Sequence, residues 1–268
     1  MTYQFTLDEI RAFWTNQAEQ HGQSPAASWS DIPAIQLEIR EILKWLDDDD
    51  HILDVGCANG YSTIQFASQK KIAIRGLDYI PQMVDEANVR LKDFGDKLTG
   101  QAEFAIGDIN ALNEPSNQYD KVIVIRVIIN LGSWENQLRA FKECARVVKP
   151  GGLLLLSEAT LQGWQKLNAF RHEWGLTDVP MPPFNNYLDQ DQVVQNAAPE
   201  LELVEIVNFS STYFVGTRIL KPLLAQATDA GIDIADPNME WNRWFSQLPA
   251  AGDYGTQKLF VFRKVSAS

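Results

Sequence analysis

Five short apolar runs lie between residues 51 and 157, and stretches with the apolar spacing of a helix separate them. The runs lack the polar alternation of a half-exposed strand, so both faces of each strand are expected to be buried. A parallel sheet covered by helices on both faces, a doubly wound α/β fold, satisfies this pattern. The predicted strands are 52–55, 72–77, 102–106, 121–125 and 153–157, and the predicted helices between them are 61–69, 81–92 and 135–148.

The residues on either side of this segment predict further helices and two more strands. Helices are expected at 6–20, 35–46, 161–175, 215–230 (kinked or restarted at Pro222) and 240–248, and strands at 201–209 and 258–262. A proline-rich loop covers 180–187. We therefore predict a helical N-terminal cap over residues 1–48 and one larger domain over 49–268. That domain has its core at 49–158 and insertions at about 159–200 and 210–256, after the fifth and sixth strands.

Composition narrows the class of protein. The chain has 268 residues, 45% of them hydrophobic, and a formal net charge of −12. A globular protein fits this composition, and the acid excess argues against a nucleic-acid partner, because phosphate binding needs clustered Lys and Arg. No apolar run approaches the roughly 20 residues of a membrane span. The two cysteines, Cys57 and Cys144, form no metal-binding pattern. We expect a cytoplasmic protein with no membrane span and no metal, and the sequence indicates no particular oligomeric state.

A glycine-rich turn, D-V-G-C-A-N-G at residues 54–60, follows the first predicted strand. Ligands of open parallel sheets bind beyond the carboxyl ends of the strands. Gly56 and Gly60 let a ligand approach the backbone there, and the next helix directs its free N–H groups to the same place. Asp78 ends the second strand, 18 residues after Gly60, where a carboxylate would accept hydrogen bonds from both ribose hydroxyls. Together these features indicate a nucleoside or nucleotide ligand.

Further side chains at the strand ends refine the ligand. The turn lacks the G-x-G-x-x-G pattern of dinucleotide-binding proteins. Asp54 would repel a pyrophosphate and instead suits a ligand with a cationic centre. Asp108 ends the third strand, where it is placed to accept a hydrogen bond from an adenine amino group. Tyr79 and Ile109 are expected to enclose the ring between them.

With Tyr119-Asp120 and the segment R-V-V-K-P-G-G at 146–152, these motifs resemble, in order and spacing, class I S-adenosylmethionine-dependent methyltransferases. The resemblance is closest to small-molecule enzymes similar to the ubiquinone-biosynthesis methyltransferases, and it covers about residues 49–158. It implies a Rossmann-like seven-stranded sheet whose last strand, 258–262, is antiparallel. It also implies S-adenosylmethionine as cofactor, with S-adenosylhomocysteine as product. The glycine turn, Cys57 included, would hold the methionine part, Asp78 the ribose and Asp108 the adenine.

The end of the fourth strand carries Arg126 and Asn130. The N/D-P-P-Y/F motif of nucleic-acid amino methyltransferases is absent there, which counts against methylation of bases, and the aminopropyltransferase turn is absent too. Arg126 lies in an apolar run, and an unpaired buried charge is unfavourable. We expect it to reach either Glu158 or an anionic substrate, and count it among both the cofactor-binding and the catalytic candidates. Asn130 is a candidate for substrate binding.

The helix after Glu158 has a polar stripe formed by Trp164, Asn168 and Arg171, with His172 beside it. This stripe either faces the ligand cleft or is simply exposed to solvent. His172 with Glu158 is the preferred acid–base pair, with Arg171 as a further catalytic candidate, and the alternative is that no base is used. The substrate-binding candidates are Asn130, Trp164, Asn168, Arg171, Asn185 and Tyr187. Tyr3, Trp14 and Trp29 either cover the cleft as a mobile lid or form the core of the cap.

The predicted function is transfer of the methyl group of S-adenosylmethionine to an O or N nucleophile of a small-molecule acceptor by in-line displacement. A natural product, a sugar or a lipid precursor would serve as the acceptor. Two alternatives remain at this stage: a protein or peptide methyltransferase, and a non-catalytic protein that binds S-adenosylmethionine.

Overall fold

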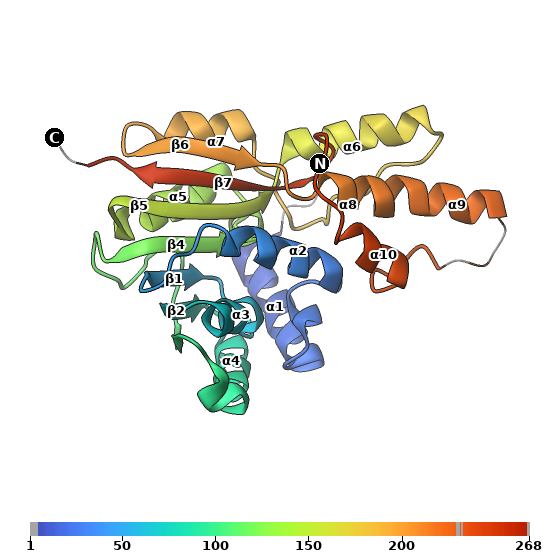
Figure 1. The fold of residues 1–268 in the computed structure, drawn as a ribbon. Coiled ribbons are helices and arrows are strands. Elements are labelled where there is room, and N and C mark those ends of the chain that lie inside the picture. The colour runs from blue at the N-terminus through green and yellow to red at the C-terminus, as the bar shows by residue number, and fades with distance from the viewer. Residues whose placement is uncertain (1–4, 229–230, 232, 267–268) are drawn as a thin grey trace.

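The computed structural model describes residues 5–228, 231 and 233–266, and its centre is a seven-stranded sheet in the order β3-β2-β1-β4-β5-β7-β6 (Figure 1). The strands β3, β2, β1, β4 and β5 run parallel to one another, and β7 is antiparallel to both β5 and β6. The predicted fold, including the antiparallel last strand, is confirmed. The strands are β1 His51–Val55, β2 Ala73–Asp78, β3 Gln101–Ile106, β4 Tyr119–Ile125, β5 Val148–Ala159, β6 Leu201–Val207 and β7 Gln257–Lys264.

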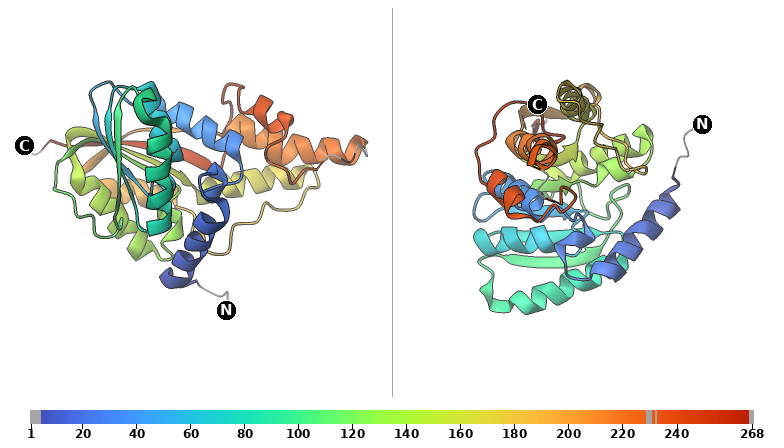
Figure 2. Two further views of the ribbon diagram at one scale, coloured as in Figure 1. Left: turned by 90° about the horizontal axis from the view of Figure 1, so that it is seen from below. Right: turned by 90° about the vertical axis from the view of Figure 1, so that its right-hand side faces the viewer.

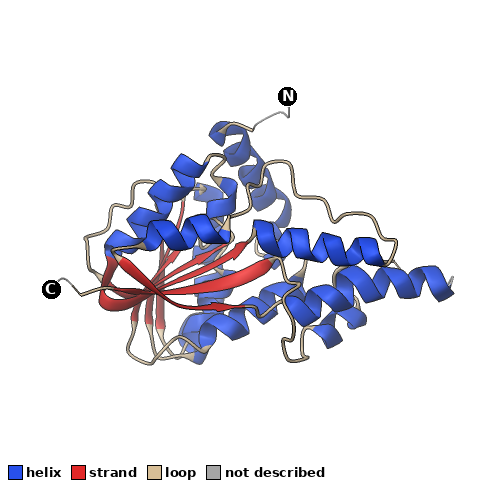
Figure 3. Cartoon of the chain, turned by 90° about the horizontal axis from the view of Figure 1, so that it is seen from above, coloured by secondary structure: helices blue, strands red, loops and turns tan. Residues whose placement is uncertain are grey.

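Helices cover both faces of the sheet, as Figure 3 shows. Along β4 the apolar side chains alternate between two cores: Val122 and Val124 pack into one, and Ile123 and Ile125 into the other. This alternation of apolar residues on both faces explains why the strand has no polar period. The first core is covered by α5 (Trp134–Val147) and α7 (Gln190–Ala197), and the second by α2 (Ile32–Leu43) and α3 (Tyr61–Gln69), with α4 (Pro81–Phe94) beside α3.

The first helix, α1 (Leu7–His21), begins at a capping box in which Thr6 and Glu9 bond each other's backbone N–H. Its Ala18 packs with Ile80 and Met83 at the start of α4, and a 3₁₀ turn (Pro25–Ala27) follows it. Figure 2 shows α1 leaning away from the body of the sheet. In contrast, α2 packs directly into the second core. The boundary of the cap at residue 48 therefore remains a prediction.

The insertions extend beyond the sheet. There, α6 (Leu161–Glu173) lies beside the run formed by α8 (Ser211–Val215), a π-helical turn (Gly216–Leu220) and α9 (Lys221–Thr228) (Figures 1 and 3). Leu167 of α6 packs with Tyr213 and Ile219 of that run. The π turn, in which the Lys221 N–H donates to Gly216 O, accommodates the irregularity expected at Pro222. Helix α10 (Glu240–Phe245) completes this layer.

Helix α7 is absent from the sequence prediction. Asp189 caps it, accepting hydrogen bonds from the N–H groups of Asp191 and Gln192 at 2.9 and 3.0 Å. Of its eight residues, only Val193 and Ala197 are buried, and two apolar positions are too few to show a helical period. None of the helices in the described residues is long and apolar enough to cross a membrane.

Candidate active site

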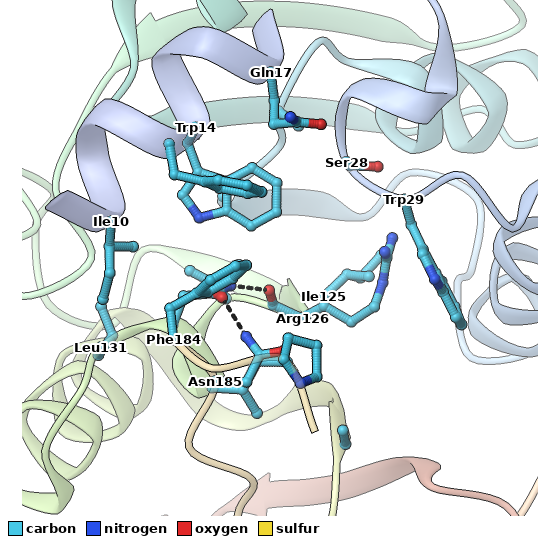
Figure 4. A pocket seen from close by; sticks show the side chains of 18 of the residues that line it. Ile10, Trp14, Gln17, Ser28, Trp29, Ile125, Arg126, Leu131, Phe184 and Asn185 are labelled. Carbon is cyan, nitrogen blue, oxygen red and sulfur yellow. Dashed lines mark hydrogen bonds between the residues drawn. The ribbon is translucent and has the colours of Figure 1, made fainter. Parts of the chain in front are cut away.

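A cavity of about 640 Å³ lies at the edge of the sheet where the parallel strands end, a size typical of small-molecule sites. Its walls come from the ends of β1–β5 and the start of β7, from α1, from residues 26–30, from the loop 179–187 and from Phe214 and Arg218. Figure 4 shows Trp14 of α1 directly above Phe184 of that loop, with Arg126 and Trp29 to one side of them. We call the part formed by the first three strands the β1–β3 end, and the rest the β4–β7 end.

The glycine turn after β1 requires its two glycines. Gly56 has φ +78°, and a Cβ on it would lie 2.2 Å from Val127 Cγ2. Gly60 has φ +71°, and a Cβ there would lie 2.7 Å from Phe104 Cζ. Side chains at these positions would therefore disturb both the local conformation and the packing around it. The turn thus presents backbone to the β1–β3 end.

Two buried carboxylates flank the turn. Asp78 at the end of β2 accepts the N–H of Ala58 on Oδ2 and the N–H of Ile80 on Oδ1, both at 2.9 Å. Burial nevertheless raises the pKa of Asp78 to about 6. Asp54, which is 2% exposed, accepts the Thr63 hydroxyl at 2.5 Å, and burial raises its pKa to about 7. A cation bound between these two carboxylates would stabilise their ionised forms.

Asp108, Ile109 and Tyr79 also line the β1–β3 end, as does Cys57. One oxygen of Asp108 accepts the Asn110 N–H at 2.8 Å, which fixes the turn after β3. The guanidinium of Arg11 lies 5.8 Å from the centre of the Tyr79 ring, so α1 covers this part of the cavity. The residues predicted to surround the adenine therefore line the same part of the cavity. Their contacts with a ligand remain predictions.

The glycine turn is tied to the segment after α1, a connection that the sequence analysis did not anticipate. The Asn59 side-chain amide donates to the carbonyls of Gly22 and Ser24, both at 2.8 Å. Arg90 of α4 donates to the Asn59 carbonyl at 2.9 Å and also to the Gln23 carbonyl. Asn59 is part of the predicted motif, but nothing in the sequence indicates that its partners lie in the N-terminal segment.

Arg126 pairs with a different acid from the one predicted. Its Nε donates to Glu38 Oε2 of α2 at 3.1 Å, and its guanidinium lies 4.9 Å from the centre of the Trp29 ring. Glu158 instead accepts the N–H groups of Val127 and Ile128 at 2.8 and 2.7 Å. The predicted Arg126–Glu158 pair is wrong. The chain turns at Arg126 (φ +55°), and this turn brings the two following N–H groups to Glu158.

The predicted acid–base pair is not formed either. His172 lies 2.7 Å from Asp178, and its side chain is 61% exposed, whereas Glu158 is fully buried. Arg171 donates to the carbonyls of Thr177 and Arg218 and does not line the cavity. These side chains hold the end of α6 and the loop after it, because the polar stripe of α6 faces that loop.

Of the other residues predicted to bind substrate, one lies outside the cavity and four line it. Asn168 accepts the Val179 N–H at 2.8 Å and does not line the cavity. Trp164, Asn130, Asn185 and Tyr187 do line it. The Asn185 amide donates to Asn130 Oδ1 at 2.7 Å, as Figure 4 shows, so these two residues join the loop to the end of β4. Their role in substrate binding remains a prediction.

Some of the lining residues were unforeseen. Tyr3 lies outside the described residues, whereas Trp14 and Trp29 line the cavity. Phe184, Arg218 and Gln257 were not predicted, because their places depend on how distant segments pack. No cluster of His, Cys, Asp and Glu that would hold a metal ion occurs among the described residues.

Residues 52–152 match a family model described as a methyltransferase domain. This part of the chain is therefore similar to methyltransferase domains, as the motifs of the sequence predict. An uncharacterized methyltransferase of Schizosaccharomyces pombe is 30% identical over 124 residues, which cover 45% of this chain and 44% of the relative. The 27-O-demethylrifamycin SV methyltransferase of Amycolatopsis mediterranei is 28% identical over 114 residues, which cover 42% and 39%. The matched segment spans less than half the length of these curated relatives.

Solved structures extend the similarity of fold beyond the methyltransferase domain. The magnesium protoporphyrin IX methyltransferase of Synechocystis, solved with bound S-adenosylhomocysteine, has a TM-score of 0.57 at 14% identity and covers 88% of this chain and 85% of that one. The [4+2]-cyclase SpnF has a TM-score of 0.57 at 21% identity, with coverage of 86% and 82%. Because this fold also occurs in a protein named as a cyclase, the reaction must be argued from the site.

Proposed function

We propose that the whole protein transfers the methyl group of S-adenosylmethionine to an O or N nucleophile of a small-molecule acceptor by in-line displacement. The observation that carries this proposal is the row of acids Asp54, Asp78 and Asp108 at the ends of β1–β3, in the same cavity as a largely apolar β4–β7 end. The first part suits a cationic nucleoside, and the second suits an acceptor placed beside it.

The residues present fit this cofactor. Asp78 accepts the backbone N–H groups of Ala58 and Ile80, and a carboxylate has about four lone-pair sites, which leaves acceptor capacity for ribose hydroxyls. Asn110 lines the β1–β3 end, and its Oδ1 is buried without a partner among the described residues, which leaves an acceptor for a ligand. Gly56 and Cys57 of the glycine turn line the cavity beside these acids, where they are placed to contact the methionine part. When bound, the cofactor supplies a methyl group activated by its positively charged sulfur.

The protein's own contribution is position and exclusion of water. Trp14 and Phe184 line the cavity and contact each other, with ring centres 6.2 Å apart, which reduces the access of water from that side. Alignment of two reactants can contribute about 7–11 kcal/mol to lowering a barrier. With His172 and Glu158 outside the cavity, the acceptor end offers no acid–base pair of the predicted kind. The alternative without a base is therefore the one we adopt.

A small acceptor is favoured over a peptide, because α1, the loop 179–187 and the late insertion all line one cavity of about 640 Å³, which is the size of a small-molecule site. The names of two relatives support a small acceptor. One is a 27-O-demethylrifamycin SV methyltransferase and the other is a demethylmenaquinone methyltransferase of Leptospira interrogans, and both named compounds are small molecules. A natural product or a lipid precursor fits the apolar walls better than a sugar does.

The cofactor assignment is tested by titrating the purified chain with S-adenosylmethionine in a calorimeter. Asp78→Ala should weaken binding on the order of 100-fold, because two hydrogen bonds to a charged group are lost. Asp93→Ala, which removes an exposed acid from α4, is the matched control and should bind like the wild type. Equal affinity of the Asp78 variant and the wild type would contradict the proposal.

Turnover is tested with S-adenosylmethionine labelled in its methyl group. The protein is incubated with a cell extract separated into a small-molecule and a protein fraction, and Asp78→Ala serves as the blank. We expect label in the small-molecule fraction. Label in the protein fraction would support a protein methyltransferase instead, and no transfer with intact cofactor binding would support a non-catalytic binding protein.

A further inference from the structure

Two arginines, Arg126 and Arg218, lie among the apolar residues of the β4–β7 end. Arg126 follows β4 and lies against Trp29, and Arg218 lies 5.3 Å from the centre of the Phe214 ring. The remaining walls here are chiefly aliphatic and aromatic: Ile125, Ile129, Leu131, Ala159, Trp164, Val179, Pro180 and Pro182. Cationic groups in an apolar cavity are unusual and indicate a specific partner.

Both guanidinium groups have donors to spare. Arg126 uses Nε for Glu38, and no oxygen among the described residues bonds its two terminal nitrogens. Arg218 uses one terminal nitrogen for Asp31 at 2.7 Å. Burial raises the pKa of Tyr187, a lining residue, to about 12, and the positive charge of Arg218 opposes this rise. The charge of Arg218 is therefore felt inside the cavity. A guanidinium has five N–H donors in a planar fork, and carboxylate or phenolate oxygens are suitable acceptors.

Glu38 and Asp31 each occupy one nitrogen of Arg126 and Arg218, and leave the other N–H donors of both guanidinium groups without an acceptor in the described part of the chain. Burial raises the pKa of Glu38 from its usual value, although Arg126 itself opposes this shift. Burial also raises the pKa of Glu158 to about 8, so that carboxyl holds its proton at neutral pH. The cofactor would bring a further positive charge to the same cavity. An anion at the β4–β7 end would therefore be stabilised by its surroundings.

The carboxylates and the histidine that line the cavity do not lie at the β4–β7 end. The acids that line the cavity belong to α1 and to the ends of β1–β3, and His21 lies at the end of α1, next to the segment that Asn59 binds. An acceptor whose hydroxyl remained protonated would find no base beside it. An acceptor that ionises by itself needs none.

We infer that the acceptor is an apolar ring compound carrying an ionised oxygen, which Arg126 binds with help from Arg218. The inference rests on the proposed methyl transfer and names its substrate class. In the transfer, a lone pair of that oxygen forms the new C–O bond, and the electrons of the methyl–sulfur bond remain on the sulfur. No proton has to be removed in the step. Arg126 then determines specificity by favouring an anionic acceptor over its neutral analogue.

The test uses two nearly isosteric probes, 2-naphthoate and 2-naphthamide, one charged and one neutral. Their affinities are measured by calorimetry for the full chain saturated with S-adenosylhomocysteine. The wild type should bind the naphthoate at least tenfold more tightly. Arg126→Gln should lose most of that preference and bind the naphthamide within about twofold of the wild type. Arg126→Lys should retain part of the preference, because it keeps the charge but loses the fork.

Two further variants separate binding from folding. Glu38→Gln leaves Arg126 charged and removes its partner, so the naphthoate should bind more tightly than to the wild type. The double variant Glu38→Gln, Arg126→Gln avoids an unpaired buried carboxylate and should show no preference while melting normally. Arg243→Gln, whose side chain is 62% exposed on α10, is the control for removing an arginine.

Four outcomes are informative. Equal binding of both probes by the wild type, or an equal loss of both in Arg126→Gln, would overturn the inference. The affinity for 2-naphthol is measured as a function of pH. An affinity that rises as the hydroxyl group ionises would show that a phenolate binds here as a carboxylate does, and would support the inference. Failure of S-adenosylhomocysteine itself to bind would instead contradict the proposed function.

Discussion

Asp54 and Asp78 couple cofactor binding to pH. Their pKa values, about 7 and about 6, lie above the usual 3.8 because both carboxyls are buried at the sheet edge. A cationic ligand binds their ionised forms, so the affinity for S-adenosylmethionine should rise from pH 5 to pH 8, by up to tenfold per pH unit for each proton released. Calorimetry in buffers of different ionisation enthalpy measures those protons. Asp54→Asn should remove the step near pH 7, and an unchanged profile would contradict the assignment.

The same two groups affect stability with a definite sign. A carboxyl whose pKa is raised by folding contributes stability that is complete below about pH 4 and is lost as the pH rises through 6 and 7. The unliganded protein therefore loses this contribution where the cofactor binds best. The rise in melting temperature caused by S-adenosylmethionine should be larger at pH 8 than at pH 6, at equal ligand concentration.

Glu158 holds the chain after β4 rather than taking part in proton transfer. It accepts two N–H groups with Oε1, and its Oε2 is buried without a partner among the described residues. Glu158→Ala should lower the free energy of unfolding by about 2 kcal/mol, because two backbone donors lose their acceptor. Glu158→Gln keeps an acceptor and should be at least as stable as the wild type at pH 8, where the wild-type carboxyl loses its proton. Denaturant unfolding at pH 7 and 8 measures both variants, and a Gln variant as unstable as the Ala variant would contradict this role.

Helix α1 and the loop 179–187 meet through aromatic rings at the mouth of the cavity. Phe184 lies with its ring centre 4.6 Å from that of Phe13 and 6.2 Å from that of Trp14. The other end of α1 is held by Asn59, which binds the carbonyl of Gly22. Phe184→Ala should therefore speed hydrogen exchange in the first two turns of α1 and leave its last turn unchanged. Trp174→Ala, which truncates an exposed aromatic side chain at the end of α6, is the control.

How much of this structure was predictable depended on the range of the interactions. The apolar strands, the glycine turn and the acids at the strand ends follow from neighbours in the sequence, and these predictions placed Asp54, Asp78 and Asp108 along one cavity. The predicted partners of Arg126 and His172 were wrong. Arg126 binds Glu38, 88 positions away, and His172 pairs with Asp178 in the loop after α6, and neither contact has a signal in the local sequence. Helix α7 was missed, since two buried residues show no period.

Across the whole molecule, Asp31 joins the N-terminal segment to the late insertion. Its carboxylate is 1% exposed and accepts the Ala34 N–H, the Tyr213 hydroxyl and, at 2.7 Å, the Arg218 guanidinium. These partners lie up to 187 positions from Asp31 in the sequence. The two segments should therefore become protected from exchange together and not as independent units.

Asp31→Ala should lower the free energy of unfolding by about 3 kcal/mol, because the buried Tyr213 hydroxyl and the partly buried Arg218 guanidinium both lose their partner. Asp178→Ala, which breaks the exposed pair with His172, should change it by less than about 1 kcal/mol. In the Asp31 variant, hydrogen exchange should speed up in residues 25–34 and 211–218 alike. Faster exchange in residues 25–34 alone would mean that the N-terminal cap is a separate folding unit. The residues that line the β4–β7 end would then stay folded when the cap opens.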